Sequence, residues 1–223
     1  MTQKVLLSWS SGKDSAWSLY HLQQTPGIEV VGLFSSINQS VGRVAMHATR
    51  TLLVQQQAAQ AGLPVEFIPL PKPCTNVQYE TIMTDFYRRT LKQGIHTIAY
   101  GDLFLEDIRQ YREMTLTKAN IKALFPLWGQ DTQKLSVKML ASGLRAQLTC
   151  IDPKQMPKHF AGAEFNHDFL NKLPETVDPC GENGEFHTFT YAGPMFKQPI
   201  PIEVGKTIER DGFIFTDLQP SAP

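Results

Sequence analysis

The chain has 223 residues, of which 42% are hydrophobic and 19% charged, a composition typical of a folded globular protein and too apolar for a disordered one. Its 21 basic and 21 acidic residues cancel, so the net charge gives no support to a nucleic-acid partner. No stretch approaches the roughly 18 apolar residues of a membrane span, and the N-terminus does not resemble a secretory signal, so we expect a cytoplasmic protein without a membrane partner.

The first half of the chain alternates strand-like and helix-like stretches, a pattern typical of a parallel sheet with crossover helices. Strands are predicted, in chain order, at residues 4–9, 28–35, 65–70, 95–102 and 145–151. Helices are predicted at residues 14–24, 47–61, 77–92 and 106–124, and a last one extends to residue 142 with Asp131 as its cap. The alternation therefore predicts an α/β fold.

The texture of the sequence changes after Asp152, where prolines become frequent and short strand-like pieces such as F-H-T-F-T-Y replace the long helices. This change predicts a second, smaller α+β domain at the C-terminus. We place the two domains at residues 1–130 and 131–223, with the boundary lying somewhere within 130–155.

The turn after the first predicted strand carries small polar residues and opens a helix: Ser10, Ser11, Gly12, Lys13, Asp14 and Ser15. Free backbone N–H groups and the helix dipole make such a turn an anion site. It is not a Walker A loop, because Leu7 stands where the first glycine is required and Asp14 where Ser or Thr must follow the lysine. Gly12 would let the backbone approach phosphate oxygens, and the serine hydroxyls would donate to them. A capped helix without any ligand is the alternative.

Two charged residues of this turn have separate expected roles. Lys13 would neutralise charge on the phosphates. Asp14 cannot attract phosphate, so we expect it either to cap the helix or to help hold a magnesium ion that bridges the phosphates.

The turn resembles the S-G-G-x-D-S pyrophosphate (PP) loop of the adenine nucleotide alpha hydrolases, also called ATP pyrophosphatases. Ser11 replaces the first glycine of that pattern, a departure we treat as minor because serine is small. The resemblance implies an ATP-binding domain at 1–130 with a five-stranded, doubly wound parallel sheet of the HUP type, in the order 3-2-1-4-5. It also implies that ATP is cut between its alpha and beta phosphates.

In a sheet of that order, ligands bind beyond the carboxyl ends of the strands, where the order reverses between strands one and four. The PP loop would then lie opposite the residues that follow the fourth strand: Tyr100, Gly101 and Asp102. Adenine is expected near Phe34 and Ser35, and His47 is a candidate for contact with ribose or phosphate. Asp102 is a candidate ligand of magnesium or a residue of the acceptor site. Helix capping is the alternative for Asp102 and His47.

A second motif, D-P-C-G-E-N-G-E-F-H-T-F at residues 178–189, accompanies I-A-Y-G-D at 98–102 and P-L-W-G at 126–129. Together they resemble the diphthine–ammonia ligase family, a branch of the same superfamily. The resemblance implies a small C-terminal domain that closes one side of the cleft. Family members activate a carboxylate on a modified histidine of elongation factor two with ATP, and ammonia then displaces AMP. Asn183 and His187 depart from the E-G-G-E-[FY]-E motif of archaeal and eukaryotic members toward the bacterial branch, and because bacteria lack diphthamide the acceptor is left open.

Glu182, Glu185 and His187 gather ionisable groups on one turn, an arrangement that costs free energy unless it faces water or a ligand. Glu185 and His187 are two residues apart, so they would share one face of a strand. One carboxylate would bind magnesium or the attacking ammonium, and His187 would act as acid or base near neutral pH. A polar turn with a capping glutamate is the alternative.

These observations predict an ATP-dependent carboxylate–ammonia ligase that works through an acyl-adenylate and releases AMP and pyrophosphate. ATP and Mg²⁺ are the expected cofactors, and ammonia and a carboxylate on a small molecule or a modified protein side chain are the expected partners. An RNA thiolase is the first alternative, disfavoured by the neutral charge and by three unpaired cysteines: Cys74, Cys150 and Cys180. A nucleotide sensor without turnover is the second, and a homo-oligomer is left open.

Overall fold

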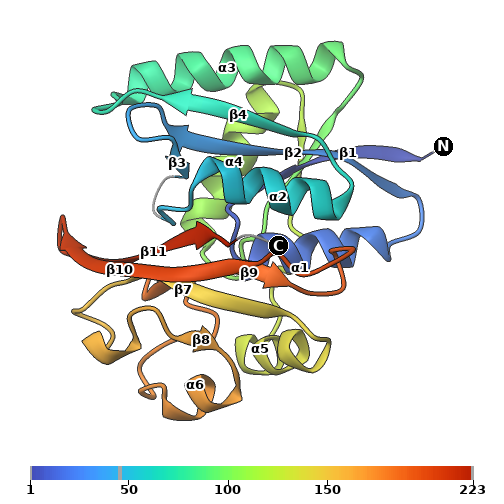
Figure 1. The fold of residues 1–223 in the computed structure, drawn as a ribbon. Helices are drawn as coiled ribbons and strands as arrows, with labels where there is room; N and C mark the ends of the chain where they lie inside the picture. The colour runs from blue at the N-terminus through green and yellow to red at the C-terminus, as the bar shows by residue number, and fades with distance from the viewer. Residues whose placement is uncertain (1, 45–46, 222–223) are drawn as a thin grey trace.

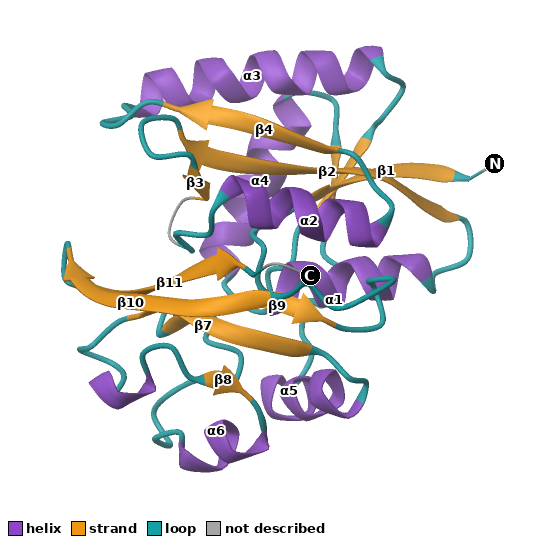
Figure 2. Cartoon of the chain, in the orientation of Figure 1, coloured by secondary structure: helices purple, strands orange, loops and turns teal. Residues whose placement is uncertain are grey.

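The computed structural model describes residues 2–44 and 47–221 and contains two β-sheets with helices on their faces (Figure 1, Figure 2). The first sheet contains β1 (Gln3–Ser8), β2 (Ile28–Asn38), β3 (Arg43–Val44), β4 (Val65–Leu70), β5 (Thr97–Ala99) and β6 (Lys122–Leu124). The second contains β7 (Arg145–Ile151), β8 (Glu164–Phe165), β9 (Phe186–Ala192), β10 (Ile202–Arg210) and β11 (Phe213–Pro220). The helices are α1 (Lys13–Gln23), α2 (Thr51–Ala61), α3 (Asn76–Lys92), α4 (Glu106–Lys118), α5 (Thr132–Ala141), α6 (His167–Lys172) and the short 3-10 helix η1 (Lys158–Phe160).

The first sheet is rich in parallel strand pairs, which confirms the predicted α/β class. Strand β1 pairs in parallel with β2 on one side and with β5 on the other, β2 also pairs in parallel with β4, and β5 with β6. Short β3 pairs with the end of β2 in the antiparallel direction. The sheet is therefore mixed and 6-stranded, whereas five parallel strands were expected.

The prediction of the fifth strand is wrong about its sheet. Residues 145–151 do form a strand, but as β7 they pair antiparallel with β8, β9 and β11 in the second sheet. The place beside β5 belongs to β6, which comes from a segment predicted as helix up to residue 124. Helix α4 ends at Lys118 because Asn120 adopts a left-handed backbone with φ of 55°, and the chain turns back to the sheet.

Several local signals for helix ends are confirmed. Asp131 caps α5, because its side chain accepts a hydrogen bond from the Lys134 N–H at 3.1 Å. Gly62 ends α2 in a left-handed conformation with φ of 70°. The helix predicted from residue 47 begins instead at Thr51, and residues 45–46, which precede the predicted helix, lie outside the described part of the chain.

The helices and sheets lie in layers (Figure 1). Helices α3 and α4 cover the outer face of the first sheet, α1 and α2 lie between the two sheets, and α5 and α6 cover the outer face of the second. One apolar cluster runs from Leu7 of β1 through Leu148 of β7 to Phe169 of α6. The two predicted domains therefore share a continuous core, and the boundary between them stays a prediction. None of the helices in the described residues has the length and apolar character that crossing a bilayer requires.

Gln57 of α2 joins the two sheets at a fully buried point. Its Oε1 accepts a hydrogen bond from Trp9 Nε1–H at 2.8 Å. Its Nε2 donates to the carbonyl oxygens of Ser11 at 2.9 Å and Thr190 at 2.7 Å. Both donor hydrogens of the amide and its acceptor are thereby used. Because Ser11 follows β1 and Thr190 belongs to β9, one side chain connects the first sheet, α2 and the second sheet.

We predict that Gln57→Leu lowers the free energy of unfolding by about 2–4 kcal/mol, because the buried Trp9 N–H loses its acceptor and the carbonyls of Ser11 and Thr190 each lose a donor. Gln55→Leu is the matched control, since Gln55 is exposed on the same helix and its loss should change stability by less than about 0.5 kcal/mol. Urea unfolding followed by circular dichroism measures both variants. Equal stability of the two would contradict the role given to Gln57.

Candidate active site

A cavity of about 370 Å³ lies at the carboxyl ends of β1, β2 and β5, where the second sheet faces the first. Most site residues predicted from the sequence line it: Ser10, Lys13, Asp14, Ser15, Ser35, His47, Tyr100, Gly101, Asp102, Glu182 and His187. Four predicted residues are not part of this lining: Ser11, Gly12, Phe34 and Glu185. Arg112 and Thr188 also line the cavity, although the sequence did not single them out. Both lie inside regular elements, α4 and β9, where a polar residue carries no local signal of function.

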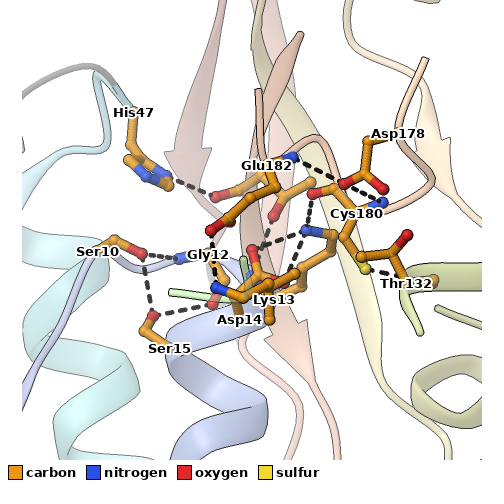
Figure 3. A network of polar contacts seen from close by, with 12 residues as sticks. Ser10, Gly12, Lys13, Asp14, Ser15, His47, Thr132, Asp178, Cys180 and Glu182 are labelled. Carbon is orange, nitrogen blue, oxygen red and sulfur yellow. Dashed lines mark hydrogen bonds and ion pairs between the residues drawn. The ribbon is translucent and has the colours of Figure 1, made fainter. Parts of the chain in front are cut away.

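The PP loop, residues 10–15, is built as a helix N-terminus with free donors (Figure 3). The first backbone bond of α1 runs from the Ala16 N–H to the Gly12 carbonyl at 3.1 Å, so the N–H groups of Asp14 and Ser15 have no partner within the helix. The Ser10 hydroxyl accepts from the Gly12 N–H at 3.3 Å and shares a hydrogen bond of 3.1 Å with the Ser15 hydroxyl. Donors and helix dipole together suit an anion.

Ser11 shows why the resembling pattern has glycine at this position. Its backbone is left-handed, with φ of 74°, which costs a non-glycine residue about 1–2 kcal/mol. The Ser11 hydroxyl bonds with the Thr49 hydroxyl at 2.8 Å, and its carbonyl accepts from the Thr190 N–H at 2.9 Å. The small size of serine is thus not the decisive property: these bonds, with that from Gln57, hold the strained backbone from behind the cavity.

Lys13 and Asp14 pair with one another at the start of α1. The Lys13 ammonium lies 2.9 Å and 2.8 Å from the two carboxylate oxygens of Asp14. Burial opposes the charge on Lys13, but the nearby acidic groups, Asp14 above all, raise the pKa of the ammonium. For Asp14 itself burial outweighs the attraction of Lys13 and raises the pKa of the carboxyl group. The cap position of α1 is Gly12, and no side chain caps it, so the capping alternative for Asp14 is wrong.

Two imidazole rings form one wall of the cavity beside Gly12. The rings of His47 and His187 pack with their centroids 4.6 Å apart and their planes tilted by 36°, and the Thr188 carbonyl accepts a hydrogen bond from His47 Nδ1 at 3.1 Å. A Cβ on Gly12 would lie 2.9 Å from Cε1 of His47 and 3.2 Å from the Thr188 carbonyl oxygen. Glycine at position 12 therefore permits a close approach of α1 to both β9 and His47.

Both histidines are neutral at pH 7 in the free protein. Burial and the nearby Lys13 charge lower the pKa of His47 to about 4, although the hydrogen bond to the Thr188 carbonyl opposes them. Burial, His47 and Lys13 together lower the pKa of His187 to about 3. The expectation that His187 titrates near neutral pH is therefore wrong for the free protein.

The loop after β5 brings a second ion pair to the cavity. A Cβ on Gly101 would lie 3.0 Å from the carbonyl carbon of Asp14, so only glycine allows this loop to approach α1 so closely. Asp102 pairs with Arg112 at 2.6 Å, and the Arg112 guanidinium lies 4.1 Å from the centre of the Tyr100 ring. Leu105 is the cap position of α4, which excludes the capping alternative for Asp102.

The two glutamates of the second motif have different positions. Glu182 lines the cavity, its Oε1 accepts from the Leu103 N–H at 2.7 Å, and burial with nearby acidic groups raises its pKa to about 7. Glu185 is buried beneath the turn, where its Oε1 accepts from the Asp178 N–H at 2.9 Å. Only His187 of the expected pair therefore reaches the cavity, and Glu185 precedes β9 instead of sharing its face.

Near the end of β2, one polar side chain has a suitable position for contact with the adenine base. Ser35 lines the cavity, and its buried hydroxyl has no hydrogen-bond partner within the described residues. Phe34 points to the opposite face of the sheet, where its ring packs 4.7 Å from Phe86 in the outer core. Of the two residues expected near adenine, Ser35 has the suitable position.

A metal ion held by the protein alone does not suit this donor set. Within residues 2–44 and 47–221, no group of three or more His, Cys, Asp or Glu side chains is arranged to hold a metal. Asp14 and Asp102 each have a cationic partner already, Lys13 and Arg112. A magnesium ion that arrives on phosphate oxygens and takes one or two carboxylates does fit.

We predict that Gly12→Val weakens ATP binding by about tenfold or more, because its side chain would collide with His47 and the Thr188 carbonyl. Gly205→Ala, far from the cavity in β10, is the control and should bind ATP as the parent protein does. Isothermal titration calorimetry measures the affinity. Normal ATP binding by Gly12→Val would place the nucleotide elsewhere.

The neutral histidines predict a loss of stability in acid. Their folded pKa values lie below the unfolded value near 6.5, so the unfolded chain takes up protons first as the pH falls through that value. Between pH 6.5 and 5.5 each histidine should cost about 1 kcal/mol of folding stability. His187→Gln should remove its share of this loss, and His96→Gln, at an exposed position, is the control. Urea unfolding at pH 6.5 and 5.5 measures the stability of the parent protein and of both variants. If all three lost the same stability between these pH values, the assignment of His187 as a buried neutral histidine would be refuted.

Comparisons with known proteins point to one family. A family model described as diphthamide synthase C-terminal domain matches residues 131–216. The diphthine–ammonia ligase of Danio rerio is 29% identical over 136 residues, which cover 56% of this chain and 52% of that protein. The one of Schizosaccharomyces pombe is 27% identical over 234 residues, covering 92% of this chain and 37% of that protein. The one of Bos taurus is 24% identical over 233 residues, which cover 94% of this chain and 86% of that protein.

The chain thus spans about half the length of the Danio rerio relative and 37% of the Schizosaccharomyces pombe relative. The family model covers the segment that carries the turn at 178–185, and the two longer alignments also take in most of the first sheet. The chain is therefore similar to the diphthine–ammonia ligases over most of its length, and to the family's C-terminal domain at residues 131–216.

Proposed function

We propose that the chain is an ATP-dependent carboxylate–ammonia ligase that releases AMP and pyrophosphate. The observation that carries the proposal is that the PP loop and the segment 181–188 face the same cavity from two different sheets. An anion site on one wall and ionisable groups on the other suit a reaction between a nucleotide and a second substrate. The names of the relatives support the same class of reaction.

The nucleotide would lie along the first wall. Its phosphates would meet the N–H groups of Asp14 and Ser15 and the hydroxyl of Ser10, while adenine would lie toward the unpartnered hydroxyl of Ser35. His47, neutral and beside Gly12, would donate or accept near the ribose or the alpha phosphate. Magnesium would bind the phosphates with Asp14 or Asp102 and would supply charge neutralisation for the leaving pyrophosphate.

The acceptor carboxylate would enter between the loop after β5 and the second sheet. Arg112, whose guanidinium lines the cavity beside Asp102, is the group suited to hold that carboxylate. One carboxylate oxygen attacks the alpha phosphorus, the bond to the bridging oxygen of pyrophosphate breaks, and an acyl-adenylate results. The enclosing second sheet would limit hydrolysis of this intermediate by water.

Glu182 is the residue that suits the ammonia half-reaction. With a pKa of about 7, its carboxyl group can accept the proton that the ammonia nitrogen loses when it attacks the acyl carbon and AMP departs. His187 is neutral and can accept or donate a hydrogen bond at the same wall. Glu185 would contribute by holding the turn.

The cytoplasmic location and any homo-oligomer stay predictions from the sequence.

The environment of Cys180 weighs against the thiolase alternative. The thiol is buried, donates toward the Thr132 carbonyl at 3.5 Å, and does not line the cavity. Burial raises its pKa far above the usual range, so the nucleophilic thiolate is not available. Burial also raises the pKa of the Cys150 thiol, to about 12.

The reaction predicts a defined set of products. With ATP labelled at the alpha phosphate, Mg²⁺, ammonium and a panel of carboxylic acids, we expect labelled AMP and an equal amount of pyrophosphate, both abolished by EDTA. A carboxylate labelled with oxygen-18 should transfer one labelled oxygen to AMP, because that oxygen forms the bond to phosphorus. Release of ADP and inorganic phosphate would refute the proposal, and binding of ATP without any product would favour the sensor.

A further inference from the structure

The Lys13 side chain lies at the wall of the cavity but is almost fully buried, and its ammonium contacts the turn at 178–182. It is 2% exposed, and its ammonium lies over the rings of Phe165 and Phe186 at 5.8 Å and 5.4 Å. There it donates to the backbone carbonyl of Cys180 and to both carboxylate oxygens of Asp14 (Figure 3). Lys13 therefore joins α1 to the turn at 178–182, although it belongs to an anion-binding loop.

We propose that Lys13 is a positioning residue, which anchors the turn at 178–182 to α1 so that Glu182 faces the cavity, and that it is not a ligand of the pyrophosphate. The role given to Glu182 in this inference rests on the proposed function. The anchoring of the turn to α1 by Lys13 does not depend on that function.

The count of donors supports this assignment. A lysine ammonium has three N–H donors, and the two oxygens of Asp14 and the carbonyl of Cys180 use all three. A phosphate oxygen could gain a donor only by displacing one of these buried partners. Buried partners of a charge are expensive to remove, because the group left behind loses both its bond and its access to water.

The location of the charge points the same way. A cation in the first turn of a helix is opposed by the positive end of the helix dipole, so helix stability does not explain a lysine at position 13. Aromatic faces and a backbone carbonyl of the second sheet's turn surround its ammonium instead. The lysine is thus built for contact between the two halves of the chain.

Hydrogen bonds within the turn fix its backbone, so that an anchor at Cys180 also fixes the position of Glu182. The Asp178 carboxylate accepts from the backbone N–H groups of Cys180 at 3.2 Å and Glu182 at 2.9 Å. Glu185 accepts from Asp178 and from the Asn183 side chain at 2.9 Å and 3.0 Å. With the carbonyl of Cys180 bound to Lys13, the turn has one fixed attachment to α1, and Glu182 lies two residues from it.

Lys13→Met tests the proposal, because methionine keeps the apolar stem against the two phenylalanine rings and removes the ammonium. We expect the affinity for ATP, measured by calorimetry, to change by less than about threefold. Backbone amides of residues 178–185 should exchange with deuterium at least about tenfold faster, and those of residues 10–12 should not. Lys134→Met, at an exposed position near the start of α5, is the control and should change neither quantity.

Lys13→Met leaves the Asp14 carboxylate without its partner, which could disturb folding, so a second variant removes that charge as well. Lys13→Met combined with Asp14→Asn removes both charges of the pair and should show the same faster exchange at 178–185. Loss of ATP affinity by tenfold or more in Lys13→Met, with AMP affinity unchanged, would show that the ammonium binds the outer phosphates and would overturn the proposal. Unchanged exchange of the turn in both variants would overturn it as well.

A double-mutant cycle tests the link to Glu182. Lys13→Met and Glu182→Gln should each lower the rate of AMP formation by about 10–100-fold, and the double variant should be no slower than the slower single one, because both act through the same carboxyl group. Additive losses would refute the link. If no acceptor supports turnover, the proposed function fails on its own, while amide exchange and ATP affinity still decide the role of Lys13.

Discussion

The attachment of the PP loop to β9 is the constraint on which the rest of the site depends. The Ser11 carbonyl accepts from the Thr190 N–H at 2.9 Å, and the Thr188 hydroxyl accepts from the Lys13 N–H at 3.0 Å. Gln57 binds the carbonyls of Ser11 and Thr190 together. A loop of the first sheet thus has its strained backbone completed by a strand of the second, so neither half of the chain forms the cavity alone.

The lysine and the arginine that line this cavity are paired with carboxylates, and its two histidines are neutral. Lys13 pairs with Asp14 and Arg112 with Asp102, while burial keeps the two neighbouring imidazoles neutral. Each arrangement avoids a lone buried charge, which would cost several kcal/mol. The consequence is a site in which a polyphosphate would add the largest charge, and in which Glu182, with a pKa of about 7, is suited to exchange a proton near neutral pH.

The family and the anchoring of Lys13 belong to one picture. The matched C-terminal model covers the turn at 178–185, and this turn reaches α1 through the Lys13 ammonium. Under the proposed function, the first sheet would bind the nucleotide, the second sheet's turn would carry Glu182, and the buried Lys13 would set their relative position. Catalysis by positioning requires that such links be stiff, because an error of about 1 Å at the reacting atoms can cost two orders of magnitude in rate.

The sequence by itself determined the α/β class, the small polar turn at residues 10–15 and the caps at Gly62 and Asp131, because these depend on local patterns of a few neighbouring residues. Most residues that line the cavity were also predicted from the sequence, through the expected sheet topology and the family resemblance. Only the tertiary structure decided which sheet receives residues 145–151, since a strand's sequence does not name its partner. It also decided that Glu185 and Phe34 face away from the cavity and that Arg112 and Thr188 face into it. The direction of the Lys13 ammonium was decided in the same way. A side chain takes the partner that satisfies its buried charge, and Cys180 lies 167 positions away along the chain.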